Sequence, residues 1–130
     1  GRCRSEGRCS TGDDFQSLRE KINRADALVF STPVYFGDLS ESAKRLLDRW
    51  RRCELKNRET SPLRGKPAIG IAAAGGSGGG AVSALLSLED YLSWLQFDIF
   101  DLVNVTRKSK GHKLEMMKAA GKRMAKSLQT

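Results

Sequence analysis

Two short stretches of the chain carry residue types that suit ligand binding, "TPVYFG" at residues 32–37 and "AGGSGG" at residues 74–79. In the first, Pro33 and Gly37 shape the backbone, while Tyr35 and Phe36 offer flat apolar surface. Aromatic faces beside dry backbone amides suit a planar heteroaromatic ligand, held at its edge by N–H groups and stacked on a ring. The alternative is that these rings pack against the next helix or against a partner subunit.

The second stretch is a glycine-rich turn between an apolar run and a helix-like segment. Such a turn lets a ligand approach the backbone closely and presents free N–H groups at a helix N-terminus. It lacks the GK[ST] ending of a P-loop, so it brings no lysine to a β- or γ-phosphate. The alternative is a flexible linker, but linkers seldom separate a buried strand from a helix. A binding loop is therefore favoured.

The elements that position these loops follow from hydrophobic periodicity. Helical spacing covers residues 13–25, 43–53, 82–95 and 112–128, and apolar strand-like runs cover 26–31, 68–74 and 97–105. Strands that alternate with helices and lack polar alternation predict a doubly wound parallel sheet, buried on both faces in a three-layer α/β/α domain. In such sheets ligands bind beyond the carboxyl ends of the strands. Both stretches follow strand ends, so we expect them to lie together.

The segment "ADALVFSTPVYFGDLSESAKRLLDRW", residues 25–50, resembles the core signature of the flavodoxin-like NAD(P)H-dependent FMN reductases. It is most similar to the branch that includes the iron–sulfur flavoproteins. In that family a T/S-P-x-Y-x-G loop is followed by a K-x-x-x-D-R helix, whose positions are taken here by Lys44, Asp48 and Arg49. The later "AIGIAAAGGSGGG" resembles the family's second flavin-contacting loop.

The resemblance implies an FMN site and the chemistry of that cofactor. The residues it places around the flavin ring are Thr32, Pro33, Val34, Tyr35, Phe36, Gly37, Ala74, Gly75, Gly76, Ser77, Gly78 and Gly79. FMN would take a hydride from NAD(P)H and pass electrons to a quinone, a flavin or a similar small-molecule acceptor, with no catalytic acid–base pair. Two alternatives remain: an electron carrier of the iron–sulfur flavoprotein type, and a degenerate flavodoxin-like module that binds without catalysis.

The resemblance also implies a part of the fold that this chain lacks. A flavodoxin-like sheet has the order 2-1-3-4-5, and the N-terminal β-α-β portion with its phosphate-gripping loop is expected to be absent here. Residues 1–130 are then a single flavodoxin-like domain with an N-terminal segment at 1–12. The strand at 26–31 would keep an open edge, which is a pairing hazard, so we expect either that this sequence is a fragment of a longer one or that another chain covers the edge. A homo-oligomer, dimer or tetramer, is accordingly expected.

Three cysteines are present, Cys3, Cys9 and Cys53. Cys53 falls within a helix and is expected to be a small buried hydrophobe. The stretch "GRCRSEGRCSTGDDF" resembles the tail of the cysteine cluster found in the iron–sulfur branch. A [4Fe–4S] cluster needs four thiolates, so Cys3 and Cys9 could contribute to one only in a longer chain. Cysteines without a metal are the favoured interpretation.

The net charge of +8 arises from 23 basic and 15 acidic residues, with much of the excess in "RKSKGHK" and "KAAGKRMAK". A basic tail can attract nucleic acid, anionic lipid or a phosphorylated cofactor. A solvated helix face is favoured, and nucleic acid is not expected because no aromatic residues interleave with the lysines. No apolar run approaches the ~20 residues of a membrane span. No signal peptide is visible either, so a cytoplasmic protein without membrane contact is expected.

Overall fold

The computed structural model describes all 130 residues and contains one four-stranded sheet. The strands are β1 (Leu28–Tyr35), β2 (Asp38–Leu39), β3 (Pro67–Ala73) and β4 (Asp98–Val105), in the order β2-β1-β3-β4. β1, β3 and β4 run parallel. The predicted parallel arrangement of these three strands is confirmed.

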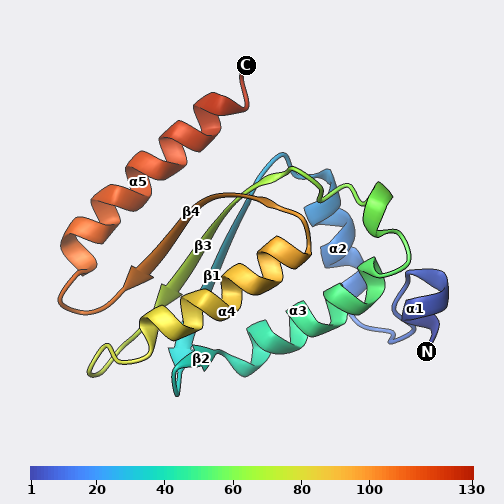
Figure 1. Cartoon of the computed structure of the whole chain (residues 1–130), viewed down its shortest axis with the longest axis horizontal. Helices are drawn as coiled ribbons and strands as arrows, with labels where there is room; N and C mark the ends of the chain where they lie inside the picture. Colours follow the sequence, from blue (N-terminus) through green and yellow to red (C-terminus); the bar gives the residue numbers. More distant parts are fainter.

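The chain forms five helices: α1 (Arg2–Glu6), α2 (Phe15–Arg24), α3 (Glu41–Glu54), α4 (Ala81–Trp94) and α5 (Lys110–Ser127). Figure 1 shows α5 alone on one face of the sheet and the pair α3 and α4 on the other, with α2 beside α3. A short 3₁₀ turn, Arg58–Thr60, lies between α3 and β3. The layers confirm the predicted α/β/α, flavodoxin-like architecture. None of the helices is both long and apolar enough to cross a membrane.

The larger core fills the space between the sheet and the helices α3 and α4. Leu47, Trp50, Leu88 and Leu92 are fully buried there. β3 is rich in small residues because α4 presses closely on it: a Cβ on Gly70 would lie 2.9 Å from Leu102 Cδ2 and 3.1 Å from Leu88 Cδ2. The glycine therefore sets the depth at which α4 packs on the sheet.

β1 was predicted to be buried on both faces, but in the structure one of its faces is exposed. Its residues alternate between buried or half-buried and exposed positions, and Val29 is 55% exposed while its register partner on β3, Ile69, is 3% exposed. The cause is the placement of α5, whose Ala120 and Met124 pack on Ile69. Along Leu28–Pro33 the outer edge of β1 has no neighbouring strand. The predicted open edge of β1 is therefore present in the structure, and its cover by another chain stays a prediction.

The segment predicted as a loop at 32–37 is largely strand, because β1 continues to Tyr35. A two-residue turn, Phe36–Gly37, then reverses the chain, and β2 pairs antiparallel with the end of β1. Both turn residues have positive φ, 50° and 73°, as a type I′ hairpin turn requires. The sheet is therefore mixed, and the expectation of a purely parallel sheet is wrong at this edge.

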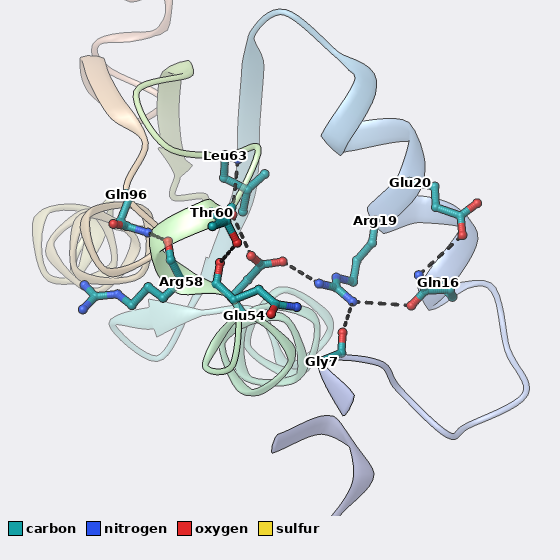
Figure 2. A network of polar contacts seen from close by, with 11 residues as sticks. Gly7, Gln16, Arg19, Glu20, Glu54, Arg58, Thr60, Leu63 and Gln96 are labelled. Carbon is teal, nitrogen blue, oxygen red and sulfur yellow. Dashed lines mark hydrogen bonds and ion pairs between the residues drawn. The ribbon is translucent and has the colours of Figure 1, made fainter. Parts of the chain in front are cut away.

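A polar network fixes the N-terminal segment, whose helix α1 was not predicted (Figure 2). Arg19 of α2 donates from Nη2 to Glu54 Oε1 at 2.5 Å and from Nη1 to the carbonyl oxygen of Gly7 at 3.0 Å. The second carboxylate oxygen of Glu54 accepts a hydrogen bond from Ser61 Oγ at 2.7 Å. The network therefore joins the N-terminal segment and α2 to the end of α3 and the turn that follows it.

Candidate functional site

The hairpin turn and the start of α4 are in direct contact at the carboxyl edge of the sheet. Ser83 Oγ donates a hydrogen bond to the carbonyl oxygen of Gly37 at 2.6 Å. Gly80, with φ of 82°, comes so close that a Cβ there would lie 2.4 Å from Gly37 Cα. Figure 1 shows the β1–β2 turn and the β3–α4 loop at the same end of the sheet. The two predicted loops therefore form one continuous surface.

The glycine-rich loop offers backbone donors to that surface. Its internal hydrogen bonds run from Gly78 N–H to the Gly75 carbonyl at 3.0 Å and from Gly79 N–H to Ser77 Oγ at 3.2 Å. Ala74 N–H donates to the carbonyl oxygen of Val105 at 2.8 Å and ties the loop to the end of β4. The amides of Gly75, Gly76 and Ser77 donate to no protein acceptor, so they are free for a ligand.

Two aromatic rings stand out from the same edge. The exposed fraction is 63% for Tyr35 and 108% for Phe36, so neither ring packs against the following helix. Phe36 also has a φ that bulky residues rarely adopt. Backbone strain of this kind is tolerated where surrounding structure imposes it, and it clusters at ligand sites. The exposed rings are therefore available for stacking.

Not every residue predicted for the site reaches the surface. Thr32 is 1% exposed, and its hydroxyl accepts a hydrogen bond from Ser40 N–H at 3.2 Å. Ser40 in turn caps α3 by accepting from Ala43 N–H at 3.1 Å. Thr32 thus positions the helix that follows the hairpin. Ala74 is likewise buried, whereas Pro33, Tyr35, Phe36, Gly75, Gly76, Ser77 and Gly79 are exposed, and Val34, Gly37 and Gly78 are half-buried.

An open groove of about 470 Å³ leads from Asp38 of the hairpin along α3 and α4. In it, Lys44 Nζ donates to Asp48 Oδ2 at 3.0 Å and to Tyr91 Oη at 2.5 Å, and Tyr91 Oη donates to Asp48 Oδ1 at 2.5 Å. Burial raises the pKa of Tyr91, and its hydrogen bond to Asp48 acts in the same direction. The sequence pointed to Lys44 and Asp48 only through the family resemblance, and nothing in it pointed to Tyr91, 43 residues from Asp48.

Arg49, the last residue of the K-x-x-x-D-R motif, holds the N-terminal segment in place. Its guanidinium donates to both carboxylate oxygens of Asp13, at 2.8 and 2.9 Å, and from Nη2 to Cys9 Sγ at 3.2 Å. It also lies over the Phe15 ring, 4.2 Å from the centroid. The hydrogen bond from Arg49 lowers the pKa of the Cys9 thiol, since it stabilises the thiolate.

The cysteines present do not fit an iron–sulfur cluster. Such a site needs four thiolates from positions around one point. Cys53 is buried within α3, and Cys9 Sγ is engaged by Arg49. No group of three or more His, Cys, Asp or Glu side chains is placed to share a metal ion. The residues of this chain therefore assign no cluster to Cys3 and Cys9.

Arg49→Gln is expected to slow the alkylation of Cys9 by iodoacetamide several-fold at pH 7.5, because the thiolate loses its hydrogen-bond donor. The folded-state pKa of Cys9 is lowered, so the thiolate stabilises the fold above the unfolded-state pKa. That contribution is lost as the pH falls through the folded-state pKa. Mass spectrometry of each cysteine against pH should show the Cys9 midpoint moving upward in the variant. Arg52→Gln, an exposed change on the same helix, is the control, and equal midpoints in both variants would refute the assignment.

Known proteins share both sequence and fold with this chain. An iron–sulfur flavoprotein of Archaeoglobus fulgidus is 37% identical over 86 residues, which are 66% of this chain and 41% of the relative. The chain therefore spans about two fifths of that protein's length. The Trp repressor binding protein from Bacillus subtilis superposes with a TM-score of 0.64 at 22% identity, covering 85% of this chain and 68% of that one.

General stress protein 14 from Treponema denticola, solved in complex with FMN, superposes with a TM-score of 0.55 at 18% identity, covering 96% of this chain and 75% of that one. At these identities the two solved structures support the fold. The sequence profile described as NADPH-dependent FMN reductase matches residues 2–112, most of the chain. The chain belongs to the NADPH-dependent FMN reductase family.

Proposed function

We propose that this chain binds the flavin ring of FMN at the carboxyl edge of the sheet, between the Phe36–Gly37 turn and the glycine-rich loop at 74–79. The contact between the two loops carries the proposal, because Ser83 and Gly80 hold the turn against the start of α4. The free amides of Gly75, Gly76 and Ser77 suit the polar edge of a heteroaromatic ring.

The residues present fit FMN in chemistry as well as in position. Exposed aromatic rings and unpartnered amides both lie at the carboxyl edge of the sheet, and the loop glycines allow a planar ligand to approach the backbone. The family match and the FMN complex of the Treponema denticola protein support the same cofactor. When bound, FMN would accept a hydride from NAD(P)H and pass electrons to a quinone, a flavin or a similar acceptor. The protein's part is to orient the ring and leave one face open.

Two other functions compete with this proposal. The Archaeoglobus fulgidus relative is an iron–sulfur flavoprotein by name, which favours an electron carrier. A cluster would need thiolates in addition to those of Cys3 and Cys9. A flavodoxin-like module that binds without catalysis is the third. A homo-oligomer and a small-molecule acceptor belong to the leading proposal.

Anaerobic absorption spectroscopy of the FMN-loaded chain separates these proposals. Loss of the flavin band on addition of NADPH or NADH would support a reductase. Reduction by dithionite alone, with no response to either nucleotide, would favour an electron carrier. Failure to take up FMN at any concentration would contradict the flavin proposal and leave the binding module.

Tyr35→Ala is expected to weaken FMN binding by about 1 kcal/mol, roughly fivefold, because an exposed ring is lost from the stacking surface. Flavin fluorescence quenching measures the dissociation constant. Phe100→Ala removes another partly exposed ring, from β4, and is the control. An affinity for FMN that is the same in Tyr35→Ala and in the unaltered chain would show that Tyr35 does not touch the ring.

A further inference from the structure

The positive charge of the chain is concentrated at its C-terminal end. The segment Arg107–Lys126 holds eight basic residues and a single acidic one, Glu115, in a chain whose net charge is +8. Glu115 pairs with Lys118, and Lys113 donates to Asn104 Oδ1 at 3.2 Å. The basic residues at the start of this segment form no ion pair, and they are exposed: Arg107, Lys108 and Lys110.

Arg107 and Lys108 lie on the turn next to the glycine-rich loop, and Lys110 is the first residue of α5. The turn is fixed by Thr106 N–H, which donates to Ser109 Oγ at 2.9 Å, and by Ser109 N–H, which donates to Thr106 Oγ1 at 3.3 Å. Thr106 packs against the glycine-rich loop so closely that a Cβ on Gly78 would lie 3.0 Å from its methyl carbon. Figure 1 shows the β3–α4 and β4–α5 loops at the same end of the sheet.

The two halves of this edge differ in charge. Beside β1 and β2, the cations Lys44 and Arg45 pair with Asp48 and Glu41. Beside β3 and β4, the segments 74–88 and 102–114 contain no carboxylate at all. Unpaired cations near an uncharged, glycine-rich backbone attract a multiply charged anion, and no local carboxylate competes for them.

We infer that Arg107, Lys108 and Lys110 form a subsite for the phosphate group of a nucleotide bound at the two loops. The inference rests on the proposed function, which places a nucleotide at this edge. Two nucleotides of that function carry a suitable group, the 5′-phosphate of FMN and the 2′-phosphate of NADPH. The shared chemistry is a phosphate monoester, and a planar guanidinium and two ammonium groups suit its oxygens.

The test uses two pairs of ligands that differ only in that phosphate: FMN with riboflavin, and NADPH with NADH. Flavin binding is followed by fluorescence quenching and dinucleotide binding by calorimetry, so neither readout needs turnover. The variant is Arg107→Gln/Lys108→Gln. The control is Lys122→Gln/Lys126→Gln, which removes the same charge from exposed positions later in α5.

We expect the variant to lose about tenfold in affinity for the phosphorylated member of one pair and to bind its phosphate-free partner within twofold of the unaltered chain. A loss confined to FMN identifies the flavin phosphate, and a loss confined to NADPH identifies the 2′-phosphate. The subsite would be overturned if the variant lost as much affinity for the phosphate-free ligand as for the phosphorylated one in both pairs. It would also be overturned if the variant lost no affinity, or if the control lost the same affinity. Riboflavin binding by the unaltered chain is independent of any phosphate. If the unaltered chain failed to bind riboflavin while the variant lost affinity for NADPH and not for NADH, the proposed flavin site would be overturned and the phosphate subsite would stand.

Discussion

Replacing Arg19 with alanine is expected to destabilise the fold by about 3–5 kcal/mol, because it leaves the Glu54 carboxylate buried without its partner. Glu54 is 4% exposed and Arg19 8%, and the two side chains meet at 2.5 Å. The same change removes the donor to the Gly7 carbonyl, so the N-terminal segment should also loosen. Urea unfolding followed by tryptophan fluorescence measures the free energy of unfolding.

Arg45→Ala is the matched control, since it removes an ion pair of the same kind whose two side chains are 69% and 83% exposed. We expect less than about 1 kcal/mol there, because solvent screens the pair. The double change Arg19→Met/Glu54→Gln should recover part of the stability lost in Arg19→Ala, since no buried carboxylate remains unpaired. Equal effects of Arg19→Ala and Arg45→Ala would contradict the importance of this buried pair.

Gly80→Ala is expected to separate the two candidate loops and to weaken flavin binding by about tenfold, or 1.4 kcal/mol. A methyl group at this position would lie 2.4 Å from Gly37 Cα, and it cannot be accommodated without moving the hairpin turn away from α4. The φ of 82° adds strain for any residue with a Cβ. We expect about 1–3 kcal/mol of destabilisation from the clash and the strain together.

Gly65→Ala is the control that separates the effect of backbone strain from the effect of moving the hairpin turn. Gly65 has a φ of 73°, and a Cβ added there would meet no atom within 4 Å, so the change adds strain without a close contact. It lies before β3, in sequence away from both loops, and should leave FMN affinity unchanged while costing about 1 kcal/mol of stability. If Gly80→Ala bound FMN as tightly as Gly65→Ala, contact between the loops would not be needed for the site.

Periodicity in the sequence was enough to predict the layers of the fold. The apolar, small-residue run at 68–74 and the helical spacing around it are local signals, and they correctly predicted a strand there within a three-layer domain. The exposure of Val29 could not be predicted, because an apolar run does not show which neighbouring helix covers each face. That depends on where α5 packs, which is decided by Ile69, Ala120 and Met124.

The meeting of the two candidate loops was predicted from the sequence, but the geometry of their contact was not. The prediction follows from a general property of parallel sheets, whose carboxyl ends share one edge. The turn at Phe36–Gly37 was missed because the usual primed-turn signal is Asn-Gly or Asp-Gly, and a phenylalanine with positive φ carries no such signal. Pro33 also misled the prediction, since the strand was expected to end at Ser31, before this proline, and it continues to Tyr35.

Long-range polar pairs lay beyond sequence reasoning altogether. Arg19 and Glu54 are 35 residues apart, and Arg49 and Asp13 are 36 apart. Nothing local distinguishes these charges from the many that face solvent. Arg49 stood out only through the family motif, and its contacts with Asp13 and Cys9 required the structure.

A single flavin site between the Phe36–Gly37 turn and the glycine-rich loop can be tested by amide chemical shifts of the ¹⁵N-labelled chain, recorded during a titration with riboflavin, which carries no phosphate. We predict saturable shifts that concentrate in both segments, 34–38 and 74–80, with one dissociation constant. Shifts confined to one segment, or concentrated in the groove between α3 and α4, would show that the two loops do not form one flavin site.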